Sequence, residues 1–356
     1  MKNLCLNNVE YKRLEDCCII LDNKRKPVTK TARKSGVYPY YGANGIQDYV
    51  SDYIFDGVFV LIGEDGSVVN ENGNPVVNWA EGKIWVNNHA HIIQEKDGVL
   101  LRYIFYFIQT IKIKNLIYGN IPKLTGNNFK SLKISVPSLE IQQKIAEILS
   151  AQDKVIELKQ KLIDRKKQQK KWLMQNLLTG KIRLKGFKGE WEKVKLEEIF
   201  SSINSGKSVK NEENGIYSIY GSTGEIGKAN SYDYDENIII VARVGANAGS
   251  LYKIYNKCKI SDNALLIRIN EKNSFLFIFY LLCQINLRNL VYGSGQPLIT
   301  SGHIKKILTC IPLIEEQTAI VEILSVQDRE IELLEKELEQ EKLKKKFLMN
   351  LLLSGK

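Results

Sequence analysis

The chain repeats part of its own text, and this repeat restricts its architecture more than any other feature of the sequence. Residues 140–181 align without a gap with residues 315–356, and just over half of the aligned positions are identical. The separation between the two copies is far longer than the repeat of a solenoid. We therefore expect the duplication of a whole unit, in which two related halves each end in the same element.

Each copy predicts one long helix. Residues that are mostly apolar recur in steps that alternate between three and four, which is typical of the contact seam of a coiled coil. Prolines precede both copies at 137 and 312, where a helix start is expected, and glycines lie near the ends of the copies at 180 and 355, where a C-terminal cap is expected. Each helix then spans about 40 residues, or ~60 Å. The predicted seam residues are Ile145, Ile148, Gln152, Ile156, Ile320, Ile323, Gln327, Ile331 and Leu334.

Two arrangements of these helices are open. Both copies place a glutamine at the same seam position, Gln152 and Gln327, and a shared polar seam residue is typical of a contact that sets register. This favours pairing of the two helices with each other. In the alternative arrangement, each is a long surface helix that packs only on the domain of its own half.

The segments between the helices are duplicated more faintly. Residues 10–16 match residues 192–198, and a tyrosine–glycine pair at 41–42 matches one at 220–221. The fold class predicted is α+β, with two mixed α/β domains in a pseudo-two-fold arrangement, joined by two long antiparallel coiled-coil helices. The predicted boundaries are a first domain at 1–138, a first helix at 139–181, a second domain at 187–313 and a second helix at 314–356.

Composition limits the class of protein. The net charge of +11 favours a polyanionic partner, although a lysine-rich composition typical of an AT-rich genome is an alternative explanation. The sequence has no apolar run of membrane-spanning length and no signal-peptide pattern, so we expect a cytoplasmic protein without a membrane partner. Six cysteines, none in a Cys-x-x-Cys pair, and three histidines predict reduced thiols and no metal site.

No catalytic motif is complete. Asn74-Pro75-Val76 lacks the second proline and the aromatic residue of an adenine methyltransferase motif. Gly206-Lys207-Ser208 resembles the end of a phosphate-binding loop, but Ser201 stands where its first glycine must be. We therefore expect no catalytic residues and no cofactor, and a self-contained DNA-modifying enzyme is the least favoured class.

Several motifs together resemble the specificity subunit of type I restriction–modification enzymes, over the full chain. They are Gly-Ser-Gly-Gln-Pro at 293–297, Ile-Pro at 311–312 before Glu-Glu-Gln, the stretch 320–328, and the closing Leu-Met-x-x-Leu-Leu-x-Gly-Lys. The first half departs from this pattern, with Gly119-Asn120-Ile121-Pro122 in place of the Gly-Ser-Gly-Gln-Pro run.

The resemblance implies a non-catalytic subunit with two target-recognition domains. Each domain would read one half of a bipartite, non-palindromic site in double-stranded DNA, and the helices would set the spacing and dock two methyltransferase subunits. Endonuclease–translocase subunits would join them, with S-adenosylmethionine, ATP and Mg in the partner subunits only. Half-site centres on one side of the duplex would lie about one helical turn, ~10 bp, apart. The alternative, a coiled-coil adaptor whose two heads bind protein, explains neither the basic charge nor the motifs.

Base-reading residues are expected on loops. The turn at 63–66, after an apolar run, corresponds to the turn at 242–245. There Glu64 would accept from cytosine N4, and Arg243 would donate to guanine. Alternatively, Glu64 and Asp65 only form a turn, and Arg243 contacts a phosphate or pairs with a surface acid. Further candidates, for which a turn or cap role is the alternative, are Tyr40, Asn44, Gln47, Asn87, Asn88, His89, Ser222, Thr223, Asn247, Asp262, Asn263 and Gln296.

A basic cluster lies in a segment poor in apolar residues. Such a cluster suits phosphate contacts, and a solvated loop is the alternative. Its members are Lys24, Arg25, Lys26, Lys30, Arg33 and Lys34.

Overall fold

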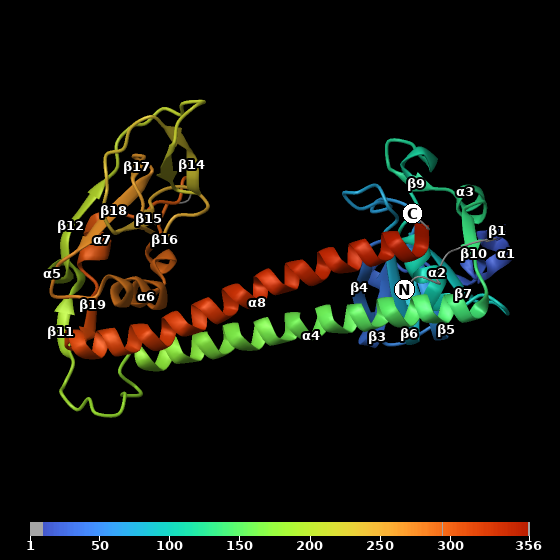
Figure 1. The fold of residues 1–356 in the computed structure, drawn as a ribbon, viewed down its shortest axis with the longest axis horizontal. Helices are drawn as coiled ribbons and strands as arrows, with labels where there is room; N and C mark the ends of the chain where they lie inside the picture. Colours follow the sequence, from blue (N-terminus) through green and yellow to red (C-terminus); the bar gives the residue numbers. More distant parts are fainter. Residues whose placement is uncertain (1–9, 294, 355–356) are drawn as a thin grey trace. The chain divides into compact units, whose positions relative to one another are not determined.

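The computed structural model describes residues 10–293 and 295–354, and the chain divides into two compact units (Figure 1). Unit 1 comprises residues 1–160 and 336–356, and unit 2 comprises residues 161–335. Each unit contains strands and helices, so the α+β prediction is confirmed. Among the residues on which the sequence analysis relies, Cys5, Ser294, Gly355 and Lys356 lie outside the described residues.

Unit 1 contains a six-stranded sheet in the order β2-β7-β5-β6-β3-β4, in which only β3 and β6 are parallel neighbours. The central strand β5 is buried on both faces, because alternate side chains of a strand point to opposite sides. Val60 and Ile62 join one apolar cluster, whereas Phe59 and Leu61 join another. The strands are β2 (Cys18–Ile20), β3 (Ser35–Gly42), β4 (Gly45–Val50), β5 (Phe55–Gly63), β6 (Val77–Val86) and β7 (Ala90–Glu95).

The main core of unit 1 is completed by both long helices. Tyr103 and Tyr106 of α2 are fully buried in it. Leu149 of α4 and Leu352 and Leu353 of α8 belong to the same cluster. The remaining elements are β1 (Glu10–Arg13), α1 (Leu14–Cys17), η1 (Asp22–Lys24), η2 (Lys30–Ala32), α2 (Leu101–Ile108), η3 (Lys114–Leu116), β8 (Ile117–Tyr118), β9 (Lys123–Leu124), α3 (Gly126–Lys130) and β10 (Lys133–Val136).

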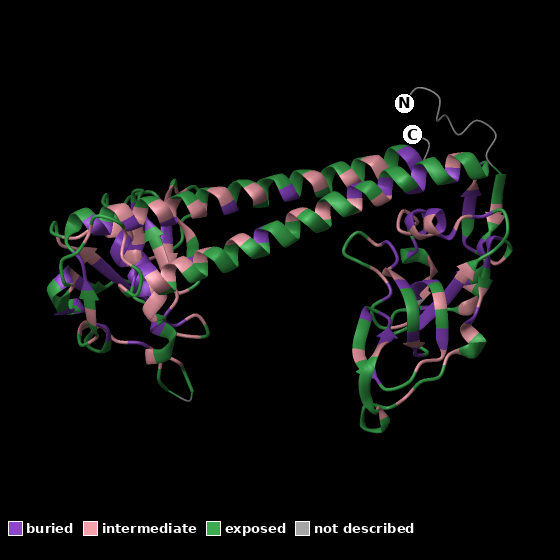
Figure 2. Ribbon diagram, turned by 90° about the horizontal axis from the view of Figure 1, so that it is seen from below, coloured by how far each residue is buried: buried purple, intermediate pink, exposed green. Residues whose placement is uncertain are grey.

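Unit 2 has a four-stranded sheet, β12-β18-β15-β16, and a three-stranded sheet, β14-β13-β17. Its main core also contains Leu177 at the end of α4, Leu178 directly after it, and Ile320 and Leu324 of α8. Figure 2 shows buried residues along the sheets of each unit. The elements are β11 (Glu192–Lys195), α5 (Leu196–Ile199), β12 (Phe200–Ser205), β13 (Tyr217–Gly221), β14 (Gly224–Ala229), β15 (Ile238–Ala242), β16 (Leu251–Ile254), β17 (Cys258–Ile260), β18 (Ala264–Ile269), α6 (Phe275–Ile285), η4 (Leu287–Leu290), α7 (Ser301–Lys305) and β19 (Leu308–Ile311).

The two units repeat the same element order. In unit 1, β1 pairs with β10 and the β3–β4 hairpin closes at Gly42 and Gly45. In unit 2, β11 pairs with β19 and the β13–β14 hairpin closes at Gly221 and Gly224. Gly45 and Gly224 both have φ near +90°, a conformation that favours glycine. We call the parts of the units outside the long helices, residues 10–138 and 187–313, the heads. The faint sequence matches between the heads therefore correspond to equivalent strands and turns.

The two long helices, α4 (Leu139–Leu177) and α8 (Ile314–Ser354), begin where the sequence predicts. In unit 1, Lys159 pairs with Glu337 at 2.6 Å, and in unit 2, Lys166 of α4 pairs with Glu330 at 2.7 Å. In unit 1 the α8 partner moves back from Glu341 to Glu337 as α4 advances from Gln152 to Lys159. In unit 2 it moves back from Glu330 to Asp328 as α4 advances from Lys166 to Lys170, so the helices run antiparallel within each unit. Mutual pairing is thus confirmed, and the alternative in which each helix packs only on its own half is wrong.

The predicted seam is wrong at one step near the start of each copy. Ile148 is 37% exposed, whereas its neighbour Leu149 is fully buried. Likewise Leu324 is fully buried, and Ile323 is only half-buried. The helices pack on the heads there and not only on each other, and this turns the buried face by one residue. Of the other seam residues, Ile145, Ile320 and Ile331 are buried, and Ile156 and Leu334 are half-buried.

The glutamines of the seam differ in role. Gln152 donates from Nε2 to the carboxylate of Glu341 at 2.7 Å and to its carbonyl at 3.1 Å. Gln327 leaves its buried Oε1 without a hydrogen-bond partner among the described residues. The register contact predicted for both copies is therefore confirmed for Gln152 alone.

A second glutamine locks each helix start to its head. Gln142 donates to the carbonyl of Pro137 at 2.8 Å and accepts from the amide of Leu100 at 2.8 Å. Its equivalent, Gln317, donates to Pro312 at 3.0 Å and accepts from Ser274 at 2.9 Å. Both glutamines are buried, so each helix enters at one fixed position on its head.

A tyrosine, an aspartate and a lysine join head and helices in each unit, and we call this set the tyrosine joint. In unit 1, the Tyr106 hydroxyl donates to Asp153 at 2.8 Å, and Asp153 also pairs with Lys345. In unit 2, Tyr280 donates to Asp328 at 2.6 Å, and Asp328 pairs with Lys170. Burial is the main cause that raises the pKa of both tyrosines, so the hydroxyls stay protonated donors.

The described cysteines are free thiols, of which Cys17, Cys18 and Cys258 are buried and Cys310 is exposed. Gly180, just after α4, has φ +68°, which confirms the predicted cap at that end. Among the residues that the structure describes, none of the helices has the length and apolar content needed to cross a membrane.

Candidate nucleic-acid interface

In unit 1, four turns meet at one end of the large sheet. The amide of Glu64 donates to the carbonyl of His89 at 2.9 Å, and the amide of Asn87 donates to Tyr41 at 3.1 Å. The amide of Gly66 donates to Pro122 at 3.1 Å. These backbone bonds hold the turns side by side. We call residues 42–45, 63–66, 87–89 and 119–124 the loop edge of unit 1.

Unit 2 uses the same backbone bonds at equivalent positions. The amide of Arg243 donates to Asn263 at 2.9 Å, that of Ser261 to Tyr220 at 2.8 Å, and that of Gly245 to Pro297 at 2.8 Å. The predicted equivalence of the turns at 63–66 and 242–245 is therefore confirmed. We call residues 221–224, 242–245, 261–263 and 297–299 the loop edge of unit 2.

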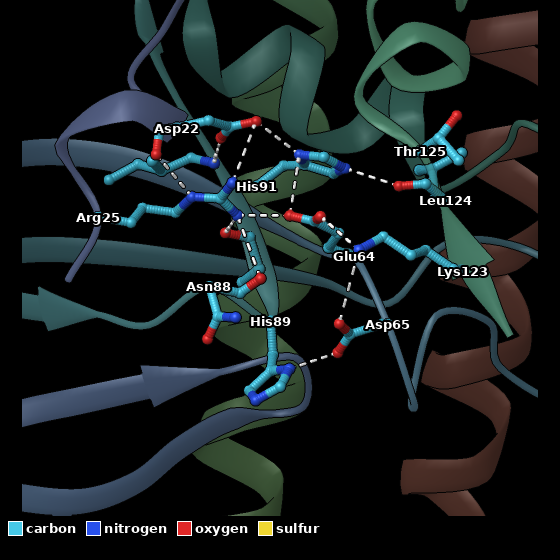
Figure 3. Close-up of polar contacts among 12 residues, drawn as sticks. Asp22, Arg25, Glu64, Asp65, Asn88, His89, His91, Lys123, Leu124 and Thr125 are labelled. Carbon is cyan, nitrogen blue, oxygen red and sulfur yellow. Dashed lines mark hydrogen bonds and ion pairs between the residues drawn. The ribbon is translucent and has the colours of Figure 1, made fainter. Parts of the chain in front are cut away.

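The loop edge of unit 1 encloses a network of charged side chains (Figure 3). Glu64 is buried, and its Oε2 accepts from Arg25 at 2.6 Å, while its Oε1 lies 3.2 Å from the Lys123 ammonium. Arg25 also donates to the carbonyl of Ala90 at 2.7 Å. Both carboxylate oxygens of Glu64 are thus occupied by cations of the protein itself.

His91 extends this network into the core. Its Nδ1 lies 2.6 Å from Asp22, its Nε2 lies 2.9 Å from the carbonyl of Leu124, and its ring stacks on Phe129 at 4.1 Å. Burial alone would raise the pKa of Asp22, but the bonds from His91 and the Ile92 amide, with Arg25 nearby, lower it. The Asp22 carboxylate and the Leu124 carbonyl are both hydrogen-bond acceptors, so each ring nitrogen of His91 faces an acceptor.

Two of the predicted contacts need correction. Glu64 was expected to offer a free carboxylate to cytosine, and Arg25 was counted among the phosphate contacts. Both side chains are largely buried, at 11% and 13% exposure, and paired with each other. A base or phosphate would have to break this pair in a site with little water, which costs several kcal/mol. Glu64 and Arg25 therefore support the turns of the loop edge from the buried side.

The exposed part of the unit 1 loop edge is formed by neighbouring residues. His89 is 48% exposed in its side chain, and its Nδ1 is held by the carboxylate of Asp65. Asn88 and Asn44 are exposed, and Gln47 accepts from Asn87 through its side-chain oxygen at 3.3 Å. The Asp65–His89 pair, which sequence reasoning did not propose, fixes the orientation of the imidazole ring.

In unit 2, Arg243 occupies the position of Glu64 without a strong partner. Its guanidinium makes only long contacts, 3.5 Å to the Ser205 hydroxyl and 3.4 Å to the Asp262 carbonyl. No ion pair involves it among the described residues. The arginine is half-buried and retains donors for a ligand. Nearby candidates are Thr223, Asn263 and Gln296, which are exposed, and Ser222 and Asn247, which are half-buried.

The basic cluster is only partly accessible. Arg33 lies over the ring of Tyr40 at 4.1 Å, bonds Asp48 and is 15% exposed. Tyr40 itself is 1% exposed, and its hydroxyl bonds the backbone of Val28. The prediction of Tyr40 as a base reader is therefore wrong, because its ring is buried. Lys26, Lys30 and Lys34 are exposed, so their ammonium groups are accessible to a phosphate. Contact of these three lysines with DNA stays a prediction.

Comparison with known proteins gives two matches along the chain to one family. The family is described as the type I restriction modification DNA specificity domain, and it matches residues 7–167 and 188–343. The MjaVIII specificity subunit of a type I restriction enzyme from Methanocaldococcus jannaschii is 30% identical, over 98% of this chain and 92% of that protein. A putative type I specificity subunit from Haemophilus influenzae, S.HindORF215P, is 40% identical over 41% of this chain and 37% of that protein.

Solved structures share the fold. The S subunit of a type I restriction–modification system from M. genitalium superimposes with a TM-score of 0.67 at 16% identity, over 97% of this chain and 96% of that chain. A second chain, from a study of complex assembly in a type I system, has a TM-score of 0.57 at 16% identity, with the same coverage. At this identity the similarity concerns the fold alone.

Proposed function

The chain belongs to the specificity subunits of type I restriction–modification enzymes, and on this premise we propose that its two loop edges read the two halves of one bipartite, non-palindromic DNA site. One observation carries the proposal. The same backbone bonds hold the same turns in both units, yet the side chains that they present differ. A constant frame with variable side chains is what a pair of readers with different targets requires.

The side chains suggest what each edge can recognise. In unit 1, the exposed amides of Asn44 and Asn88 suit adenine, and the oriented ring of His89 adds a donor or an acceptor. In unit 2, the weakly held guanidinium of Arg243 suits the two acceptors of guanine. Glu64, which is buried, supports the unit 1 edge and does not read a base.

The chain itself has no catalytic role in this proposal. Two methyltransferase subunits dock on the paired helices, and endonuclease–translocase subunits join the complex. S-adenosylmethionine, ATP and Mg belong to those partners, and the complex works on DNA in the cytoplasm. The family assignment disfavours the alternative of a coiled-coil adaptor whose heads bind protein.

Exchange of one head tests the proposal. Residues 187–310 are replaced by the corresponding segment of a related specificity subunit, and the methylated motif is determined in cells that also express the methyltransferase. One half of the motif should change while the other half stays, because the heads have separate cores. A change in both halves, or methylation without any bipartite motif, would contradict it.

Arg243 allows a residue-level test. Arg243→Ala should cost ~1–3 kcal/mol in specific binding and relax the motif at one position. Arg243→Lys is the matched variant, because it keeps the charge and loses the planar pair of donors. If Arg243 contacts a phosphate instead, alanine weakens binding to all sequences evenly and lysine restores it. Unchanged base preference and unchanged salt dependence in both variants would remove Arg243 from the interface.

A further inference from the structure

Unit 1 contains a cavity of about 690 Å³ between its head and the last turns of α8. The head contributes the β3–β4 turn at Asn44, the loop 70–77 and the chain after α2, from 109 to 112. The helix contributes residues from 342 to 350. Asn44, Asn72 and Lys346 are exposed, so the cavity opens to solvent.

The lining of this cavity is basic and contains no carboxylate. Its lysines are Lys112 from the head and Lys342, Lys345 and Lys346 from α8. Lys112 donates to two neutral oxygens, the Asn72 carbonyl at 2.6 Å and the Asn74 side chain at 2.9 Å, which leave its charge uncompensated. Lys346 makes no ion pair among the described residues. Lys345 and Lys342 do have acidic partners, Asp153 and Glu339, but both partners lie outside the lining.

The other lining residues are amides and small apolar groups. Asn70 accepts the amides of Asn72 and Asn74 with its side-chain oxygen, so its NH₂ group remains a donor. Gln109 and Thr110 add further polar groups, and the lining has no aromatic ring. Bases of single strands are usually held by stacking on rings. Ammonium and amide donors without a ring suit phosphate oxygens.

The cavity adjoins the loop edge of unit 1. Asn44 belongs to both, and the amide of Gly63 donates to the carbonyl of Val76, a lining residue, at 3.0 Å. A duplex read by the loop edge would therefore bring its backbone close to the lysines. Building on the proposed function, we propose that this cavity is a phosphate site that takes the sugar–phosphate backbone of the DNA beside the half-site read by unit 1.

The experiment uses the chain in complex with its methyltransferase and a duplex that contains the methylated motif. Lys342→Gln with Lys346→Gln removes two charges and keeps residues with good helix propensity. Lys344→Gln is the matched control, because Lys344 lies on the same helix and outside the lining. Lys345 is left unchanged, since it belongs to the tyrosine joint.

Each lost phosphate contact lowers the slope of log affinity against log salt by about 0.9. The double variant should therefore lose about 1.8 in slope, and its affinity should depend about twelvefold less on a change from 50 to 200 mM salt. The methylated motif should stay the same, and the control should match wild type. A slope equal to that of wild type would overturn the phosphate site. Wild-type complexes that methylate no bipartite motif would instead refute the proposed function.

A second measurement separates the DNA backbone from a small free anion. Acetylation of Lys346 is followed by mass spectrometry with duplex, or with inorganic phosphate at the same phosphate concentration. Protection by the duplex alone supports the proposal. Equal protection by inorganic phosphate, or protection by neither, would contradict a site for the DNA backbone.

Discussion

Removal of the aspartate from one tyrosine joint should loosen one unit and leave the other unchanged. In Asp153→Ala, the Tyr106 hydroxyl loses an acceptor at 2.8 Å and Lys345 loses its carboxylate. An unsatisfied buried hydroxyl costs ~1–3 kcal/mol. The ion pair, whose side chains are 22% and 35% exposed, adds ~0–1 kcal/mol. The Ser150 hydroxyl, 3.2 Å from that of Tyr106, compensates in part, so we expect a total of ~2 kcal/mol.

A chain with two compact units need not unfold in one step, so local opening is the better measure. Native-state hydrogen exchange of the α2 amides should accelerate ~30-fold in Asp153→Ala, whereas the α6 amides should keep their rates. Asp328→Ala should give the reverse result, because Asp328 holds Tyr280 of α6. Glu147→Ala, at an exposed position of α4, is the control. Equal acceleration in both units, or an effect no larger than that of Glu147→Ala, would refute the reasoning.

Three further predictions concern other parts of the chain. Ile331→Glu with Leu334→Glu should reduce methylation sharply, because it places two charges in the seam. The control Leu333→Glu, at a position that is 60% exposed, should not reduce it. Equal methylation activity of the two variants would show that the helices do not pack there. The folded-state pKa of Asp22 is lowered from its ordinary value of 3.8, so its contribution to stability is present above pH 3.8 and is lost as the pH falls through the lower folded-state pKa. The melting temperature of Asp22→Asn should therefore fall less at acid pH than that of wild type. The same acid dependence in both proteins would contradict this. Iodoacetamide at pH 8 should modify Cys310, which is exposed, well before Cys258, which is buried, and Cys283, which is half-buried, because desolvation raises the pKa of the Cys258 and Cys283 thiols to about 11. Peptide mass spectrometry that finds equal rates for the three cysteines would contradict this.

The sequence predicted those features that depend on repeated or local text. Both helix starts, the glycine-closed hairpins and the equivalence of Glu64 with Arg243 follow from matches between the two halves. The tyrosine joint was also within reach, because its aspartate and lysine are identical in both copies of the helix. Identical polar residues within a seam were a signal of contacts between elements.

Other features depend on long-range packing, which the local pattern does not contain. The burial of Glu64 arises because Arg25, His91 and Lys123, all distant in sequence, converge on it. A carboxylate in a turn reads as exposed until its partners are known. Leu149 is buried in place of the predicted Ile148 because the helix packs on its head at that point. A seam predicted from contacts between two helices alone does not include contacts with the head.

The core of unit 1 contains Leu352 and Leu353, and this has a consequence for synthesis on the ribosome. Unit 2 has all its residues once residue 335 has emerged, whereas unit 1 waits for residues beyond it. At typical elongation rates, roughly 10–40 s separate the emergence of residue 160 from that of residue 353. During that interval the N-terminal head has an incomplete apolar core. The usual order of folding, N-terminal domain first, is thus reversed, and the nascent N-terminal head is the part most in need of a chaperone.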